Sequence, residues 1–199
     1  MKKALLHLHS ADPTLGAIIR QVGPYRITYH DPDFTTLARS IVSQQLSGKA
    51  ASTIFGRVLE QAAARNGRLS PTRVLALGAD GLRPLGLSQQ KATYLLNLAA
   101  HRIPYARLAD LPDDEVIATL TAVKGVGVWT AHMFLLFALG RLDILPTGDL
   151  GIRNAIHRAY QLPAPPSPAE IESIAQPWRP YASVASWYLW RSLDGPAQL

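Results

Sequence analysis

Apolar side chains recur at spacings of three and four along most of this chain. The spacing is clear in three segments: Leu37, Ile41 and Val42; Ile54, Val58 and Leu59; and Tyr94, Leu95 and Leu98. It places side chains on one face of an α-helix. Strict alternation, which would predict strands, is confined to a weak candidate at Arg26 to His30. We therefore expect an all-α fold of about ten helices.

Capping residues mark several of the expected helix starts. Four such starts are Asp12-Pro13, Ser70-Pro71, Pro112-Asp113 and Ser167-Pro168. Ser and Asp oxygens accept the free N–H groups of a first helical turn, and proline fits the first position because no donor is needed there. Glu170 adds the second half of a capping box to Ser167. We expect a helix at each start, including one from Asp113 to Val123.

The chain is basic without carrying a polybasic run. Its 199 residues are 48% hydrophobic and 17% charged, a balance typical of a globular protein with a sizeable core. Lys and Arg number 20 against 14 Asp and Glu, a net charge of +6, and only five of the 20 are lysine. This excess favours a polyanionic partner, either nucleic acid or an anionic membrane surface. We expect no membrane partner, because no basic amphipathic helix is apparent.

Cysteine is absent, which excludes several classes of site. The chain can form no disulfide framework, thiolate nucleophile, Cys-ligated zinc site or iron–sulfur cluster. Its six His are scattered without an H-x-x-x-H pair, so a His zinc site is not expected either. The longest uncharged stretch, Gly125 to Gly140, has 16 residues, fewer than the roughly 20 that cross a bilayer. We interpret it as buried core and expect a soluble, intracellular protein without a signal peptide.

Two glycines one residue apart separate the helix at 113–123 from a second expected helix at 128–139. The turn between them is Lys124-Gly125-Val126-Gly127. Glycine permits a positive φ and lets a ligand backbone approach, and the free N–H groups of the second helix begin there. With Lys124 as a point charge, the turn suits a DNA phosphate. The alternative is a tight helix–helix turn whose glycines serve only chain reversal.

A lone carboxylate, Asp149, follows Gly127 by 22 residues. Either Thr147 or Asp149 could cap a helix that runs to Tyr160, and an Asp in such a position is more often a cap than a catalyst. The interval, however, is the length of one helix and a return loop. The carboxylate could therefore face a cleft beside the hairpin.

Five segments, in register and spread over most of the chain, carry a family pattern. In chain order they are Ile41-Val42-Ser43-Gln44-Gln45-Leu46-Ser47, Gly86-Leu87-Ser88 with Lys91-Ala92, Val126-Gly127 with Trp129-Thr130-Ala131, Pro146 to Asp149, and Pro177-Trp178-Arg179-Pro180-Tyr181. Each alone is weak, but together they are specific. On these segments the chain resembles the helix-hairpin-helix (HhH-GPD) DNA glycosylase superfamily, in the branch of 3-methyladenine DNA glycosylase II.

The resemblance implies a two-lobed all-α fold with the active-site cleft between the lobes. Residues 1–199 would form one glycosylase unit, with a central lobe at 32–141 that includes the hairpin at 113–140, and a terminal lobe from 1–31 plus 142–199. The match begins near Asp12, so we expect no room for the N-terminal β-rich domain of some relatives. We expect the protein to be cytoplasmic, associated with the nucleoid in a bacterium, and by resemblance to act on DNA as a monomer.

The implied reaction is monofunctional hydrolysis of the N-glycosidic bond of alkylated bases, of the 3-methyladenine type, in double-stranded DNA during base excision repair. The family's catalytic Asp falls on Asp149, which would stabilise an oxocarbenium-like transition state and orient or deprotonate the attacking water. No cofactor is required, but the backbone carbonyls of Thr121, Val123 and Val126 would hold K⁺ or Na⁺ at the hairpin.

The implied base pocket combines aromatic and aliphatic side chains: Trp129, Met133, Leu150, Trp187 and Tyr188. The three aromatic residues would stack on a cationic base, whereas Met133 and Leu150 replace aromatic residues of some relatives. Trp129 also occupies the position of the Schiff-base lysine of bifunctional relatives, so we expect no lyase activity. The alternative for the aromatic residues at 187–190 is core packing, because not all of them can face one side.

A glycosylase must turn the target nucleotide out of the base stack. The loop from Ser43 to Ser47 would fill the vacated space with Gln45, or with Leu46 as the apolar alternative. A polar helix interior or turn is the other interpretation of this loop. The implied DNA contacts in the loop and the hairpin are Gln44, Gln45, Leu46, Lys124, Gly125, Val126, Gly127 and Thr130.

Two other functions remain open on the sequence. A non-catalytic helix-hairpin-helix module would bind duplex DNA regardless of damage and would not need Asp149. A glycosylase for mismatched or oxidised bases would differ in its pocket, and the neutral aromatic lining favours a cationic base. We expect Trp178 and Tyr181 to be structural, Arg179 to pair with a phosphate or a carboxylate, and His132 to be a core residue.

Overall fold

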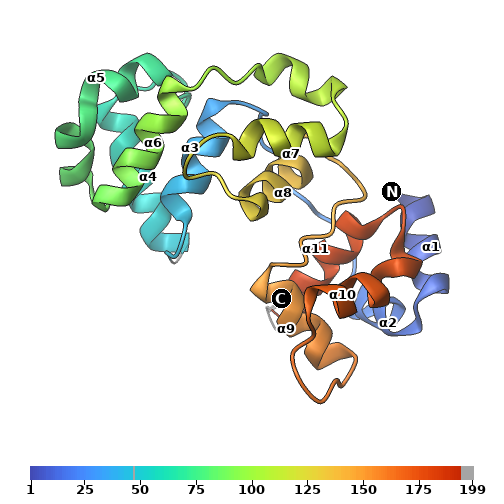
Figure 1. The fold of residues 1–199 in the computed structure, drawn as a ribbon. Coiled ribbons are helices and arrows are strands. Elements are labelled where there is room, and N and C mark those ends of the chain that lie inside the picture. The colour runs from blue at the N-terminus through green and yellow to red at the C-terminus, as the bar shows by residue number, and fades with distance from the viewer. Residues whose placement is uncertain (47, 194–199) are drawn as a thin grey trace. The chain divides into compact units, whose positions relative to one another are not determined.

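A computed structural model describes residues 1–46 and 48–193, in which eleven α-helices and three 3-10 helices make up the regular structure (Figure 1). The predicted all-α class is confirmed, since the described residues hold no strand and only one isolated bridge, between Arg65 and Arg68. The strand candidate at residues 26–30 is wrong. That segment is irregular, and the backbone N–H of His30 donates to the carbonyl of Phe137 at 2.9 Å instead of pairing with a strand.

The chain forms two compact units. Unit 1 comprises Met1–Tyr29 and Gly140–Leu199, and unit 2 comprises His30–Leu139. The lobe boundaries expected from the sequence, at 31/32 and 141/142, each lie two residues further along the chain. None of the helices described is long and apolar enough to cross a membrane.

Unit 1 is built around a buried C-terminal helix. Its described helices are α1 (Lys2–Ala11), α2 (Pro13–Val22), α9 (Leu150–Ala159), α10 (Pro168–Ala175), η3 (Gln176–Trp178) and α11 (Ala182–Leu193). Helix α11 packs against both α2 and α9. Eight consecutive residues of α11, from Ala182 to Leu189, are buried, so this helix forms the centre of the unit 1 core.

A buried carboxylate ties the helices of unit 1 together. Asp12 caps α2 by accepting a hydrogen bond from Leu15 N at 3.0 Å through Oδ1, while its Oδ2 accepts one from Trp178 Nε1 at 2.8 Å and one from the Tyr160 hydroxyl. Burial, followed by the hydrogen bond to Asp12, raises the pKa of Tyr160 above its ordinary value. The expected structural role of Trp178 is thus confirmed, because its indole is fully buried and donates to this carboxylate.

Unit 2 contains the hairpin. Its described helices are α3 (Phe34–Ser43), α4 (Gly48–Gln61), α5 (Pro71–Leu82), η1 (Arg83–Leu85), α6 (Gln89–Ala100), η2 (Tyr105–Asp110), α7 (Asp113–Thr121) and α8 (Val128–Phe137). Helix α3 contacts α4, α6 and α8, and α7 packs on α8. Leu37, Ile41, Leu95 and Phe134 are among the buried apolar residues of this unit, so the three-and-four spacing of α3 and α6 does mark core-facing sides.

Local capping chemistry explains where several of these helices begin. Asp12 and Ser167 cap α2 and α10 with their side chains, and Ser167 and Glu170 form the predicted capping box. Helix α5 begins at Pro71 as expected, although Ser70 makes no side-chain cap bond. The predicted C-terminal ends are less accurate than the predicted starts, because α7 and α8 each end two residues before the predicted positions, at Thr121 and Phe137.

Candidate functional site

The two glycines of the hairpin have different structural roles. Gly125 has a φ of +109°, and a Cβ built on it would lie 2.3 Å from Cγ of Tyr94, so only glycine fits there. Gly127 has a φ of −91° and a ψ of 171°, an extended conformation that any residue can adopt. A Cβ on Gly127 would meet no atom within 4 Å. Chain reversal therefore explains Gly125 but leaves Gly127 without an internal reason to be glycine.

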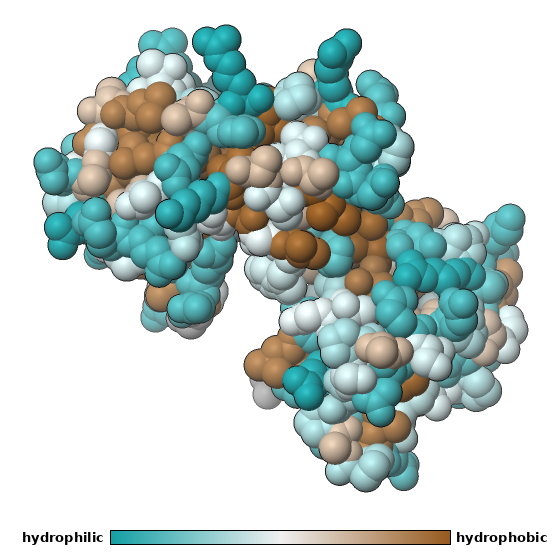
Figure 2. All heavy atoms as spheres, in the orientation of Figure 1, coloured by the Kyte–Doolittle hydropathy of each residue, from teal (hydrophilic) through white to brown (hydrophobic). Residues whose placement is uncertain are grey.

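Helix α8 begins directly after Gly127, which is its N-cap and has no side chain to cap it. Val128 and Trp129 in the first turn are 53% and 43% exposed, and hydrophobic residues reach the surface over α7 and α8 in Figure 2. Lys124 is exposed beside them. Thr130 has a buried side chain, so any DNA contact it makes would come from its backbone. Backbone N–H groups, a lysine and two exposed apolar side chains thus share this helix end.

The turn of the hairpin is tight around the carbonyls expected to hold a cation. The backbone N–H of Val126 donates to the carbonyl of Val123 at 2.9 Å. The expected ligands at Thr121, Val123 and Val126 are all neutral backbone carbonyl oxygens, the kind of donor that coordinates K⁺ in channel filters. In the part of the chain that the structure describes, no group of three or more His, Cys, Asp and Glu side chains could hold a metal ion.

The loop after α3 presents Gln45 in a constrained conformation. Gln45 is exposed and has a φ of +56°, in the left-handed region, and Leu46 beside it is 38% exposed. Gln44 points elsewhere, because its Nε2 donates to the carbonyl of Gly125 at 3.1 Å. Ser47, the last residue of the predicted loop, lies outside the described residues. The loop is therefore a turn that exposes two side chains, not a helix interior.

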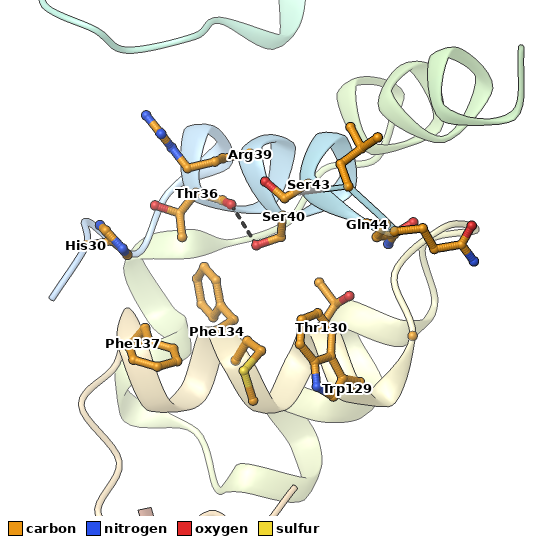
Figure 3. Close-up of a pocket in the computed structure, with 14 residues that line it drawn as sticks. His30, Thr36, Arg39, Ser40, Ser43, Gln44, Trp129, Thr130, Phe134 and Phe137 are labelled. Carbon is orange, nitrogen blue, oxygen red and sulfur yellow. Dashed lines mark hydrogen bonds between the residues drawn. The ribbon is translucent and has the colours of Figure 1, made fainter. Parts of the chain in front are cut away.

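A pocket of about 740 Å³ lies in unit 2 between α3 and α8 (Figure 3). It brings together seven of the site residues predicted from sequence: Gln44, Gln45, Leu46, Gly127, Trp129, Thr130 and Met133. Thr36 and Ser40 of α3 point toward the α8 side, where Phe134 and Trp129 lie. Their hydroxyl groups donate to the backbone carbonyls of Asp31 and Thr36 at 2.7 and 3.0 Å, so their oxygens remain acceptors toward the pocket.

In unit 1, Asp149 caps helix α9 and accepts two hydrogen bonds on one carboxylate oxygen. Its Oδ1 accepts from the backbone N–H of Ile152 at 2.8 Å and from Nε1 of Trp190 at 2.8 Å. The residue is 9% exposed. Asp149, not Thr147, is thus the cap of this helix. The carboxylate is also held by a side chain from α11, which a simple cap would not require.

The segment that leads to Asp149 is fixed to the same helix. Ile144 N donates to the Ser183 hydroxyl at 2.9 Å, and Ala182 N donates to Oδ1 of Asp143 at 3.1 Å. Arg179 donates to the carbonyl of Asp143 at 2.7 Å and lies 3.2 Å from the carboxylate of Glu172. Of the two partners considered for Arg179, the structure contains the carboxylate. Helix α11 and the residues before it therefore position the whole segment.

Two of the three aromatic residues expected to stack on a base lie inside unit 1. Tyr188 is fully buried, its hydroxyl donates to the carbonyl of Gly23 at 2.9 Å, and Trp187 and Tyr25 lie against its ring. Burial raises the pKa of Tyr188. Trp187 is 8% exposed, whereas Leu150, the first residue of α9, is 68% exposed. Trp129 is thus the aromatic residue of the predicted set with a ring open to a ligand.

Sequence reasoning missed three contributors to these sites. Trp190 holds Asp149, although we considered it only as core packing. Thr36 and Ser40 were missed as the polar wall of the unit 2 pocket. Their signal was present: with Ser43, they recur at intervals of four and three, which places them on one side of the expected helix. The role of Trp190 could not be distinguished from those of Trp187 and Tyr188, because three aromatic residues within four positions point to different sides of a helix and the sequence does not say which side faces the site.

Known proteins match the chain over most of its length. The family described as "HhH-GPD superfamily base excision DNA repair protein" matches residues 38–180. Two proteins of Schizosaccharomyces pombe, "Alkylbase DNA glycosidase-like protein mag2" and "DNA-3-methyladenine glycosylase 1", are 29% and 32% identical over 96% of this chain and 92% and 87% of their own. The solved structure of 3-methyladenine DNA glycosylase from the same yeast, in complex with abasic DNA, has a TM-score of 0.84 at 31% identity and covers 96% of this chain and 97% of that chain.

Proposed function

The chain belongs to the HhH-GPD superfamily of base excision DNA repair proteins, and we propose that it is a monofunctional DNA glycosylase that releases alkylated bases of the 3-methyladenine type from double-stranded DNA. The names of the relatives support this activity and substrate class. The single observation that carries the proposal is the buried carboxylate of Asp149, held by the start of α9 and by the indole of Trp190.

Asp149 would act at the sugar. Alkylation of a ring nitrogen makes the base cationic and already a good leaving group, so the reaction needs little acid catalysis. It needs an anion that stabilises the positive charge developing on the deoxyribose and that orients or deprotonates the attacking water. The N–H groups of Ile152 and Trp190 fix the carboxylate before DNA binds, so little reorganisation accompanies the reaction.

Trp129 would bind the base. Its ring is 43% exposed and lines the unit 2 pocket beside Met133 and Phe134. A cationic base stacked on this indole gains an attraction that a neutral base does not, of about 0.5 to 2 kcal/mol. Trp129 offers no amine for a Schiff base, which supports base release without β-elimination.

The hairpin would hold the phosphate backbone. The N–H groups at the start of α8 and the ammonium of Lys124 supply positive charge, and the missing side chain of Gly127 lets a phosphate approach. Thr121, Val123 and Val126 would hold K⁺ or Na⁺ through their carbonyls, and that ion would add charge beside the phosphate. Gln45, or Leu46, would fill the space that the flipped nucleotide leaves.

Base release from duplexes that each carry one lesion tests the proposal. Wild-type protein should release 3-methyladenine and spare an undamaged control, and strand breaks should appear only after hot alkali. Asp149→Asn should abolish release while duplex binding persists or improves, because a negative charge near DNA is removed. Binding without release from any lesion would instead support a non-catalytic module, and breaks without alkali would contradict the monofunctional assignment.

A further inference from the structure

One face of helix α6 contacts both loops to which we assign DNA contacts. Lys91, Tyr94 and Asn97 follow one another at intervals of three, so they lie along one side of the helix. Lys91 reaches the end of α3, whereas Tyr94 and Asn97 reach the hairpin. We infer that this face is a brace that couples the Gln44–Leu46 loop to the hairpin, and that Lys91 is a positioning residue for the loop, not a phosphate ligand. The inference rests on the proposed function.

Lys91 holds the end of α3 through backbone carbonyls. Its Nζ donates to the carbonyl of Val42 at 2.7 Å and to that of Gln44 at 2.5 Å. The last carbonyls of a helix lack partners within the helix, and a cation there also interacts favourably with the helix dipole. Burial lowers the pKa of Lys91. Two of its three N–H bonds are thus directed into the protein, immediately before the exposed Gln45.

The loop is anchored a second time, to the hairpin itself. The side chain of Gln44 donates to the carbonyl of Gly125 at 3.1 Å. Gln45 follows with its φ of +56°, and Leu46 N closes the turn by donating to the carbonyl of Ser43 at 3.2 Å. A non-glycine residue in this region costs about 1 to 2 kcal/mol and persists only where the surroundings hold it. The bonds of Lys91 and Gln44 supply that support.

Helix α6 fixes the hairpin from the same side. The ring of Tyr94 packs so closely on Gly125 that no Cβ fits between them, and its hydroxyl accepts a hydrogen bond from Gln90 at 2.6 Å. Asn97 Nδ2 donates to the carbonyl of Lys124 at 3.4 Å. The phosphate anchor and the inserted side chain are therefore held at a set separation. Such a separation is what an enzyme needs in order to hold a duplex by its backbone and insert Gln45 at one base pair.

Three lysine variants separate this role from a phosphate contact. Lys91→Met keeps a long side chain but removes the donors, Lys124→Met removes the expected phosphate contact, and Lys3→Met in α1 is the exposed control. Binding to an undamaged duplex is measured against salt concentration. Lys124→Met should lower the slope of log K against log salt by about one, whereas Lys91→Met and Lys3→Met should leave it unchanged.

Base release in single turnover gives the second measurement. Lys91→Met should slow release of a lesion paired in duplex by roughly tenfold or more, but only by about twofold when the lesion lies opposite an abasic site, where the loop has little to displace. Lys91→Arg, which keeps charged donors, should recover part of the loss. Fluorescence of 2-aminopurine at the target position reports flipping without catalysis and, with the duplex saturated by protein, should fall in Lys91→Met but not in the Lys3→Met control.

Several outcomes would overturn the inference. A reduced salt slope in Lys91→Met would show that Lys91 binds a phosphate. An equal loss of release rate on the paired lesion and on the lesion opposite an abasic site would show that Lys91 does not act through the inserted loop. If Lys91→Met melts well below wild type, Gln44→Met takes its place, because it removes the bond to Gly125. Its loss of release rate should likewise be larger on the paired lesion. An equal loss on both substrates in Gln44→Met would contradict the brace. If wild type flips 2-aminopurine yet releases no base from any lesion, the proposed function fails while the brace stands.

Discussion

The indole Nε1 of Trp190 donates a hydrogen bond to Oδ1 of Asp149 at 2.8 Å, and the same oxygen accepts the backbone N–H of Ile152 at 2.8 Å. Gly151 lies between these donors, where a Cβ would be 3.0 Å from both Oδ1 of Asp149 and Cδ1 of Trp190. The carboxylate is therefore confined by an amide, an indole and a residue without a side chain.

Trp190→Phe should slow base release by roughly tenfold or more, because a hydrogen bond to a charged group contributes about 1.5 to 3 kcal/mol. The variant removes the N–H and keeps an aromatic ring between α11 and α9. Single-turnover release of 3-methyladenine is the measurement, with binding to the same duplex as the control. Binding should not change. A wild-type rate in the variant would show that the indole does not position Asp149.

Gly151→Ala should reduce release to a similar degree, since its methyl group would force Asp149 or Trp190 to move. Overpacking of this kind costs about 1 to 3 kcal/mol. Gly148→Ala is the matched control, because a Cβ at that position meets no atom within 4 Å. The rate of base release and the thermal unfolding of the two variants are compared, which tests whether Asp149 and Trp190 need the space at Gly151. Equal activity in both would mean that the space at Gly151 does not matter.

The hairpin glycines should respond differently to alanine. Gly125→Ala combines a φ of +109° with a clash against Tyr94, so we expect the free energy of unfolding to fall by about 2 to 4 kcal/mol. Gly127→Ala should fold as wild type does and should weaken binding to every duplex alike, because only the approaching phosphate meets the new methyl group. Denaturant unfolding and duplex titrations measure these effects. A change selective for one lesion in Gly127→Ala would contradict the phosphate anchor.

Stability should fall in alkali because of Tyr160. Burial and the hydrogen bond to Asp12 raise the pKa of Tyr160 above its ordinary value of 10.0. The unfolded chain then loses this proton at lower pH than the folded chain, so the contribution is complete below pH 10 and decreases as pH rises further. Tyr160→Phe should therefore lose less stability than wild type between about pH 9 and about pH 11. Denaturant titrations at both pH values measure the free energy of unfolding of each protein. An equal loss in Tyr160→Phe and wild type would contradict the assignment of this loss to Tyr160.

Local chemistry along the sequence accounts for much of the fold. Asp12, Ser167 and Asp149 cap their helices through atoms of the neighbouring three residues, which is why capping patterns locate helix starts well. Helix ends are less predictable because they depend on how a turn packs, as at Thr121 and Phe137. Residues 26–30 alternate weakly, yet a strand needs a partner that the fold does not supply.

The sequence by itself determined the helical class, the hairpin and, through the five segments, the family, and it predicts a polyanionic partner and Asp149 as the catalytic carboxylate. Only the tertiary structure decided which aromatic residue does what. Trp187, Tyr188 and Trp190 are neighbours on one helix, and their roles differ because the packing of α11 buries Tyr188 and turns Trp190 toward Asp149. Likewise, nothing in the sequence distinguishes Lys91 from the other basic residues, whereas in the fold its ammonium donates to the carbonyls of Val42 and Gln44. Such contacts join residues far apart in the chain, and no local pattern encodes them.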